Sequence, residues 1–129
     1  MATILFQIVG TVVRGNGYGR QLGFPTANLD GSEYREKNLA IPSGVYAGIA
    51  ELTGSGERFR AAIVIGAKVE NDIPKIEAYL LDFSGDLYGK TLKLTLTKHL
   101  RPFRDFPDEA TLKQTIATDV ATVRETVAP

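Results

Sequence analysis

The sequence predicts a mainly β protein, an antiparallel barrel of five or six strands with one helix packed on its outside. Most of the chain alternates apolar and polar residues at every second position, which is typical of strands. Only the C-terminal stretch changes to a helical period, and no helical pattern separates the strands, as the βαβ units of a parallel sheet would require. With 129 residues, 43% hydrophobic and 23% charged, the chain fits one domain over residues 1–129.

Five segments carry the strand pattern. Two of them flank the sequence TGSGE and are expected to form a hairpin. In the last segment, leucines alternate with threonines and lysines, so one face is expected to be buried and the other solvated. The expected strands cover residues 4–13, 44–52, 58–66, 75–83 and 91–100.

One amphipathic helix is expected at the C-terminal end, over residues 108–125. Its apolar residues recur every three or four positions, and Asp108, which follows a proline, is a candidate N-cap. These apolar positions are Leu112, Ile116, Val120 and Val123.

Residues 15–43 form the longest strand-poor region of the chain and include the sequence GYGRQLGFPTANL. A loop of this length is uncommon inside a compact domain and is usually either functional or disordered. The segment is therefore the first candidate for a binding loop.

Charge and composition exclude several classes of function. Fifteen basic and fifteen acidic residues leave no net charge, so the chain lacks the electrostatic footprint of a nucleic-acid or membrane binder. It has no cysteine, which excludes disulfides and thiol catalysis. The N-terminal sequence MATILFQIVG has no basic start and is too short for a signal peptide or membrane span. We expect a cytoplasmic protein that acts as a monomer on small molecules.

Three features suggest other kinds of site, but none of them fits the pattern that such a site requires. The sequence GDLYGKT, residues 85–91, has three residues between its glycines where a P-loop has four, and a strand pattern follows it, so a turn is expected. The sequence GNGYG has the wrong spacing for a dinucleotide fold and no helix after it. His99 is the only histidine, and no metal site or catalytic triad is evident around it.

Four stretches together resemble the riboflavin kinase family: GTVVRGNGYGRQLGFPTANL, PSGVYAG, IEAYLLDFSGDLYGK and LRPFRDF. The resemblance runs from about residue 6 to residue 123. It implies a six-stranded antiparallel Greek-key barrel with a C-terminal helix, in agreement with the pattern above. It also implies that the chain uses ATP to phosphorylate riboflavin at its 5′-hydroxyl, giving FMN and ADP.

The resemblance assigns the long loop two roles. Its glycines and arginine are expected to cover the nucleotide phosphates, since small residues let backbone N–H groups approach and an arginine adds a forked donor. Thr26 and Asn28 match the positions whose oxygens meet Mg²⁺, or another divalent ion, and a phosphate. The phosphate-side residues are Gly17, Gly19, Arg20, Gly23 and Pro25, the proline holding the backbone in its turn.

Glu77 matches the catalytic carboxylate of the family. The alternation places it on one strand face with Tyr79, Leu81 and Phe83, and a carboxylate in so apolar a strand needs a partner or a purpose. As a general base it would accept the proton of the riboflavin 5′-hydroxyl. A glutamate that simply faces water at a sheet edge is the alternative.

The flavin is expected to lie against the segment LRPFRDF and the helix after it. By the resemblance this segment is a flap in which Arg101 and Phe106 contact the isoalloxazine ring, a flat apolar body. The alternative is that Arg101 is only a charged residue at the surface.

The chain departs from the family pattern at three points. Val64 stands where the family has an asparagine, and no Pro-Thr-Phe precedes the Glu77 strand. Phe103 replaces an acidic residue of the flap. The N-terminal FMN adenylyltransferase domain of bacterial members, with its His-x-Gly-His motif, is not seen, so the expected product is FMN.

These departures leave one rival, a catalytically impaired barrel that binds flavin or nucleotide without turnover. The retention of Thr26, Asn28 and Glu77 together argues against it, because a binding protein has no need of the base. A purely structural barrel would not explain the long loop.

Overall fold

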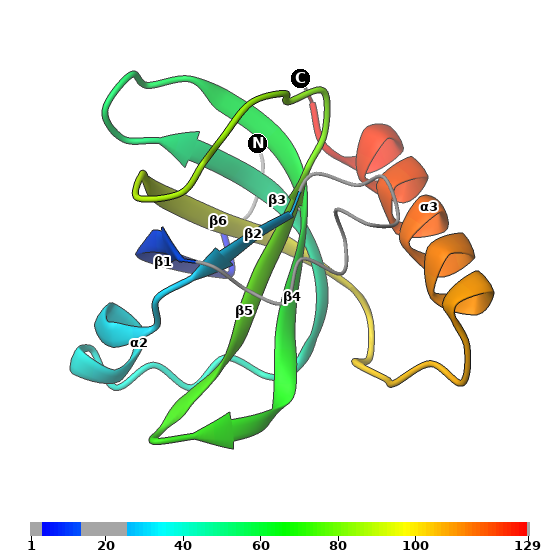
Figure 1. The fold of residues 1–129 in the computed structure, drawn as a ribbon, viewed down its shortest axis with the longest axis horizontal. Helices are drawn as coiled ribbons and strands as arrows, with labels where there is room; N and C mark the ends of the chain where they lie inside the picture. Colours follow the sequence, from blue (N-terminus) through cyan, green and yellow to red (C-terminus); the bar gives the residue numbers. More distant parts are fainter. Residues whose placement is uncertain (1–3, 14–25, 129) are drawn as a thin grey trace.

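The computed structural model describes residues 4–13 and 26–128, which form a β-barrel with a long helix on its outside (Figure 1). The segment between residues 13 and 26 lies outside the described residues. The elements are β1 (Phe6–Val13), β2 (Thr26–Leu29), α2 (Ser32–Glu36), β3 (Gly44–Leu52), β4 (Arg58–Glu70), β5 (Ile73–Leu80), β6 (Thr91–Arg101) and α3 (Glu109–Thr126).

The six strands close into a barrel in the order β1-β2-β5-β4-β3-β6, and every neighbouring pair is antiparallel. Strands β3, β4 and β5 are consecutive neighbours, and β6 returns to lie beside β3, which is a Greek-key arrangement. Closure gives each strand a neighbouring strand on both sides. The expected six-stranded barrel with a C-terminal helix is confirmed.

The barrel is filled by alternate side chains from every strand, as the period of two predicts. In β6 the three leucines at 92, 94 and 96 are fully buried, while the residues between them are half-buried on the outside. The largest fully buried side chains of the described residues are Tyr46, Ile8, Ile63, Ile65, Ile76, Leu92, Leu94, Leu96, Val45 and Val123.

Helix α3 covers the outer face of β3 and β4, beside the end of β5 (Figure 1). Val123 packs against a small outer cluster with Ala47, Ala62 and Leu81. The helix begins as predicted, because the Asp108 side chain accepts a hydrogen bond of 2.7 Å from the backbone N–H of Thr111. Among the described residues, no helix is both long and apolar enough to cross a membrane.

The region expected to be one long loop contains two short elements, β2 and α2. Four residues of β2 are too few to show an alternation, and its pairing with β1 and β5 comes from the closure of the barrel. Helix α2 has only five residues, and it is fixed by the buried Tyr34, whose hydroxyl accepts a hydrogen bond from the N–H of Ile41. Tertiary contacts, rather than sequence period, define both elements.

The β4–β5 hairpin is longer than expected and includes the stretch that departs from the family pattern. Glu70 pairs with Ile73, and the two residues between them, Asn71 and Asp72, have φ values of 52° and 65°. Two consecutive positive φ angles in a two-residue loop are the signature of a type I′ turn. The departing stretch therefore forms a hairpin, with one register shift between Ile65 and Val69.

Phe83 was expected on the same face as Glu77, and this prediction is wrong. Strand β5 ends at Leu80, and Asp82 then adopts a positive φ of 61°, which turns the chain. The Phe83 ring packs instead edge-on against Phe59, at 5.2 Å between centroids, beside the barrel core.

The GDLYGKT sequence lies, as expected, in the turn region before β6 and not in a strand-to-helix loop.

Candidate active site

The candidate site lies on the outer face of β5, where β2 runs beside it. Thr26 is the cross-strand partner of Tyr79, and Asn28 is the partner of Glu77. Cross-strand partners project to the same side of a sheet. Because the alternate residue Ala78 is fully buried on the barrel side, these four side chains share the outer face.

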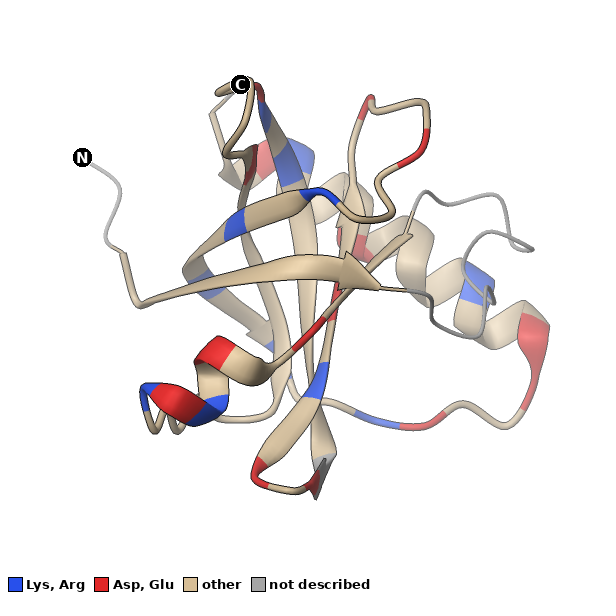
Figure 2. Cartoon of the chain, turned by 60° about the vertical axis from the view of Figure 1, so that its left-hand side comes forward, with Lys and Arg blue, Asp and Glu red and all other residues tan. Residues whose placement is uncertain are grey.

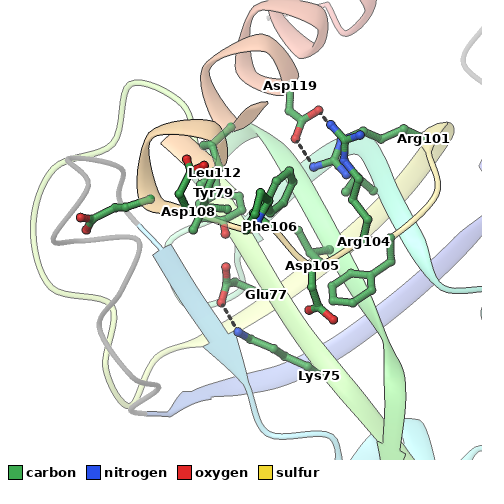
Figure 3. A pocket seen from close by; sticks show the side chains of 16 residues that line it. Lys75, Glu77, Tyr79, Arg101, Arg104, Asp105, Phe106, Asp108, Leu112 and Asp119 are labelled. Carbon is green, nitrogen blue, oxygen red and sulfur yellow. Dashed lines mark hydrogen bonds and ion pairs between the residues drawn. The ribbon is translucent and has the colours of Figure 1, made fainter. Parts of the chain in front are cut away.

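A cavity of about 340 Å³ opens on this face (Figure 3). We call it the α3 cavity, because it lies between the outer face of β4 and β5, the β6–α3 connection and the first half of α3. Its volume lies in the range of small-molecule sites. It is lined by Val45, Val64, Lys75, Glu77, Tyr79, Arg101, Phe103, Arg104, Asp105, Phe106, Pro107, Asp108, Glu109, Leu112, Ile116 and Asp119.

Glu77 is a buried carboxylate, only 6% exposed, at the wall of the α3 cavity. Lys75, two residues earlier on the same face, places its Nζ atom 3.2 Å from Glu77 Oε2 (Figure 3). Tyr79, two residues later, shares a hydrogen bond with Glu77, and burial together with the nearby Glu77 charge strongly raises the pKa of the Tyr79 phenol. The phenol therefore stays protonated, and it can donate to the Glu77 carboxylate.

The alternative of a glutamate that faces water is wrong, because Glu77 is buried and paired. A buried carboxylate is stable only with such partners. A carboxylate held by partners at a cavity wall can accept a proton from a bound hydroxyl. Its surroundings thus fit the general base that the resemblance implies.

Arg101 is not a plain surface cation. Its guanidinium donates two hydrogen bonds to Asp119 of α3, from Nε at 3.0 Å and from Nη2 at 2.8 Å. The guanidinium also lies 5.7 Å from the centroid of the Phe106 ring. Arg101 and Phe106, both expected to contact the flavin, therefore line one cavity together.

The donor set on β2 fits a hard divalent cation. Thr26 and Asn28 supply a hydroxyl and an amide oxygen, and the Glu77 carboxylate lies on the neighbouring strand. Among the described residues, no group of three or more His, Cys, Asp and Glu side chains could hold a metal ion by itself. This set suits an ion such as Mg²⁺, which keeps waters and substrate oxygens as its other ligands.

The phosphate-side prediction falls outside the described residues. Gly17, Gly19, Arg20, Gly23 and Pro25 all belong to the segment that the structure leaves undescribed, so their roles stay predictions. The described residues on either side of it are informative. Val13, the last residue of β1, pairs with Asn28, and Thr26 follows the segment directly. Both ends of the segment therefore join the barrel at the candidate site.

Sequence reasoning assigned no role to three polar residues of the site, Lys75, Tyr79 and Asp119. Lys75 and Tyr79 could have been found from the period of two, because they are the outer-face neighbours of Glu77. Asp119 could have been found from the helical period instead. It is an acidic residue three positions after Ile116, on the buried side of the predicted helix.

His99, expected to have no catalytic role, lies edge-on against Tyr46 and does not line the α3 cavity.

Comparison with family models and with curated proteins indicates one family. A family model described as riboflavin kinase (flavokinase) matches residues 3–127. A bifunctional riboflavin kinase/FMN adenylyltransferase of Escherichia coli K12 is 37% identical over 123 residues, which cover 93% of this chain and 37% of the relative. The chain thus spans little more than a third of the length of this relative.

Two solved structures share the fold. A riboflavin kinase from Trypanosoma brucei matches with a TM-score of 0.66 and 28% identity, over 94% of this chain and 78% of the other. A Streptococcus pneumoniae structure described as a macrolide-efflux protein matches with a TM-score of 0.78 and 29% identity, over 92% of this chain and 38% of the other.

Proposed function

The chain belongs to the riboflavin kinase family, and from this premise we propose that it transfers the γ-phosphoryl group of ATP to the 5′-hydroxyl of riboflavin, forming FMN and ADP. The observation that carries the proposal is the buried, partnered carboxylate of Glu77 at the wall of the α3 cavity, beside Asn28 of β2. The proposed base, the strand that carries Thr26 and Asn28, and a cavity in the size range of small-molecule sites then lie together.

Glu77 serves as the general base of the transfer. The riboflavin 5′-oxygen attacks the γ-phosphorus as the bond from that phosphorus to the bridging oxygen of ADP breaks. The hydroxyl proton passes to the Glu77 carboxylate, and the ADP oxygen leaves with the electron pair. Phosphoryl transfer needs little covalent help from a protein, so the main task of the site is to place the reactants in line.

Thr26 and Asn28 hold the divalent cation that accompanies the nucleotide, Mg²⁺ or an ion like it. When bound, such an ion neutralises charge on the transferring phosphates. The two residues come from a strand whose partner carries the base, so the nucleotide phosphates are brought to the face on which Glu77 lies. Support for this role comes from the donor chemistry and the strand register.

The segment before β2 covers the nucleotide phosphates. Its residues Gly17, Gly19, Arg20, Gly23 and Pro25 are assigned this role on the family resemblance, supported by the attachment of the segment at Val13 and Thr26. Backbone N–H groups of a glycine-rich loop can approach phosphate oxygens closely, because no Cβ atoms intervene.

The isoalloxazine ring of riboflavin lies in the α3 cavity. Phe106, Val64 and Leu112 give the cavity an apolar part, while the Arg101 guanidinium offers a flat polar surface. A flat aromatic ligand with polar edges matches this combination. Val64, which replaces the family's asparagine, is the cross-strand partner of Glu77 and so adds apolar surface close to the base.

We also propose that residues 1–129 work as a single kinase domain, as a monomer in the cytoplasm and without nucleic acid. The net charge of zero supports action on free small molecules. In the described part of the chain, acidic and basic residues are interspersed rather than gathered on one face (Figure 2). Size-exclusion chromatography with light scattering tests the monomer.

The direct test is conversion of riboflavin to FMN by the purified chain, with ATP and Mg²⁺, followed by separation of the two flavins. We expect FMN to accumulate when ATP is present. FMN formation should stop when a chelator removes the divalent ion. Calorimetry with riboflavin and with ADP separates the catalytically impaired barrel from the kinase. Tight binding with no FMN under several nucleotides and metals would contradict the proposal.

A further inference from the structure

Asp119 is a buried acid to which the proposed reaction gives no role. It lies in the middle of α3 and is 6% exposed. Among the side chains that the structure describes, which leave out residues 68 and 69, it and Glu77 are the only buried polar or charged residues apart from tyrosines. Both line the α3 cavity. A buried carboxylate far from the ends of a helix is unfavourable unless its charge is matched.

The charge of Asp119 is matched by a two-pronged contact with Arg101. Arg101 Nε donates to Asp119 Oδ1 at 3.0 Å, and Nη2 donates to Oδ2 at 2.8 Å, the planar geometry in which such pairs are strongest. The remaining group, Nη1, donates to the carbonyl of Pro102 at 3.2 Å. All three nitrogens of the guanidinium therefore have acceptors, and its plane is fixed in orientation.

Arg101 is also the last residue of β6, the point where the chain leaves the barrel for the β6–α3 connection. Its guanidinium lies 5.7 Å from the Phe106 ring centroid, and the guanidinium of Arg104 lies 5.1 Å from the same ring. Figure 3 shows Asp119 and Arg101 joined by two dashed lines, with Phe106 beside them at the cavity. The contact thus ties the helix to the segment that carries Phe106.

We propose that Asp119 is a positioning residue for riboflavin, which holds the Arg101 guanidinium and, through it, the Phe106 side of the α3 cavity in the shape that receives the isoalloxazine ring. The inference rests on the proposed function. Asp119 acts through Arg101 and does not contact the flavin. A cavity wall that is already in place spares the ligand the free energy of ordering it.

A second ion-pair cluster on the same helix supplies a matched control. Near the C-terminal end of α3, Arg124 donates to both oxygens of Asp82, at 3.0 and 2.8 Å, and Arg60 lies 3.5 Å from Asp82. The Asp82 side chain is 60% exposed and does not line the α3 cavity. Both clusters tether α3 to the barrel, but only one of them forms the cavity wall.

The test compares Asp119→Asn, Arg101→Gln, their double variant and the control Asp82→Asn. Riboflavin affinity is measured without turnover by quenching of flavin fluorescence, and KM for riboflavin, KM for ATP and kcat are measured separately. A cavity wall that the ligand itself must order costs binding free energy, so we expect Asp119→Asn to weaken riboflavin binding by roughly 10- to 100-fold. KM for ATP should stay within about twofold, and Asp82→Asn should leave every binding and kinetic parameter at the wild-type value.

The double variant shows whether Asp119 acts through Arg101. If it does, Asp119→Asn adds nothing further once Arg101 has been replaced, so the two effects are strongly non-additive. If instead Asp119→Asn weakens riboflavin binding equally in both backgrounds, Asp119 touches the flavin itself and the proposal is overturned. Equal effects on the affinities for riboflavin and ATP would also overturn it, because they would indicate only a structural role.

Two further outcomes remain informative. If Asp119→Asn does not fold, Arg101→Lys keeps a positive charge opposite Asp119 but loses the planar fork, and the same selective loss of riboflavin affinity is expected. An unchanged affinity in Arg101→Lys then overturns the proposal. A wild-type chain that binds riboflavin but makes no FMN contradicts the proposed kinase function alone, since the affinity comparison still decides the role of Asp119. A wild-type chain that binds no riboflavin contradicts both.

Discussion

The two faces of strand β5 have opposite roles, although their residues alternate along eight positions. The inner face carries Ile76, Ala78 and Leu80, which are buried in the barrel core. The outer face carries Lys75, Glu77 and Tyr79, which line the α3 cavity. The inner side chains stabilise the fold by burying apolar area, and the outer ones are proposed to bind and react. One strand can thus hold core side chains and the proposed catalytic carboxylate one residue apart.

Of the three outer residues only Glu77 is buried, and its surroundings differ from those of the inner residues. The barrel itself encloses the inner residues, whereas Glu77 lies at the wall of the α3 cavity, paired with Lys75 and Tyr79. Changes on the inner face should therefore alter stability first, and changes on the outer face should alter catalysis first. Four substitutions test this separation, beginning with the largest expected effect.

Glu77→Gln should lower kcat by about 1,000-fold, within the usual range for loss of a general base, because the amide cannot accept the proton. The side chain keeps its size, so the melting temperature should change by only a few degrees. FMN formation in single-turnover mixtures measures the rate, and circular dichroism checks the fold. A variant with more than a tenth of the wild-type kcat would show that Glu77 is not the base.

Ile76→Ala, one residue away on the inner face, should lower the stability of the fold and leave catalysis unchanged. Removing this fully buried side chain leaves a cavity in the core and should lower the free energy of unfolding by about 2–5 kcal/mol. Urea denaturation measures the loss. Well below the melting temperature, kcat per folded molecule should stay near the wild-type value. A 100-fold lower kcat in folded Ile76→Ala would contradict the proposal that the inner face serves stability and the outer face serves catalysis.

Asn28→Ala tests the outer face of β2, opposite Glu77. Removal of one preorganised electrostatic contact typically costs about 100-fold, so kcat/KM for the nucleotide should fall by that factor. The concentration of Mg²⁺ needed for half-maximal rate should rise, while riboflavin affinity without nucleotide should not change. If riboflavin affinity falls and the Mg²⁺ dependence does not, Asn28 belongs to the flavin side of the site.

Tyr79→Phe removes only the phenol oxygen beside Glu77. The hydrogen bond from the phenol holds the Glu77 carboxylate in position, and a displaced base reacts more slowly, so we expect kcat to fall by roughly tenfold. KM for riboflavin should change little, because the ring remains. Steady-state kinetics at saturating ATP measures kcat and KM for riboflavin separately. An increase in KM with kcat unchanged would assign Tyr79 to flavin binding instead.

The barrel could be predicted from the sequence because its main strands alternate clearly and its helix changes period. The hairpin partners β3 and β4 and the last strand β6 were expected at nearly their observed positions. Strand β2 and helix α2 could not be predicted, because four or five residues are too few to show a period and their position depends on contacts made after the barrel closes. The turn at Asp82 was not predicted either, because Asp82 follows the alternating stretch KIEAYLL and only its positive φ shows that the chain turns there.

The site was predicted less completely, and for a different reason. Thr26, Asn28 and Glu77 were identified through the family resemblance, but their adjacency depends on the register between β2 and β5, which no local pattern encodes. The pairing of Arg101 with Asp119 joins residues 18 positions apart, and only the packing of α3 against the barrel brings them together. Long-range contacts of this kind follow from topology rather than from composition.

The central claim is that the outer face of β5 presents its base to the riboflavin 5′-hydroxyl. A crystal structure of the chain with riboflavin, ADP and Mg²⁺ tests it most directly, through the distance from the Glu77 carboxylate to the 5′-oxygen. We predict hydrogen-bond distance, about 2.6–3.2 Å or one bridging water, with the isoalloxazine ring in the α3 cavity. A flavin bound outside this cavity, or a 5′-oxygen beyond reach of Glu77, would contradict the account.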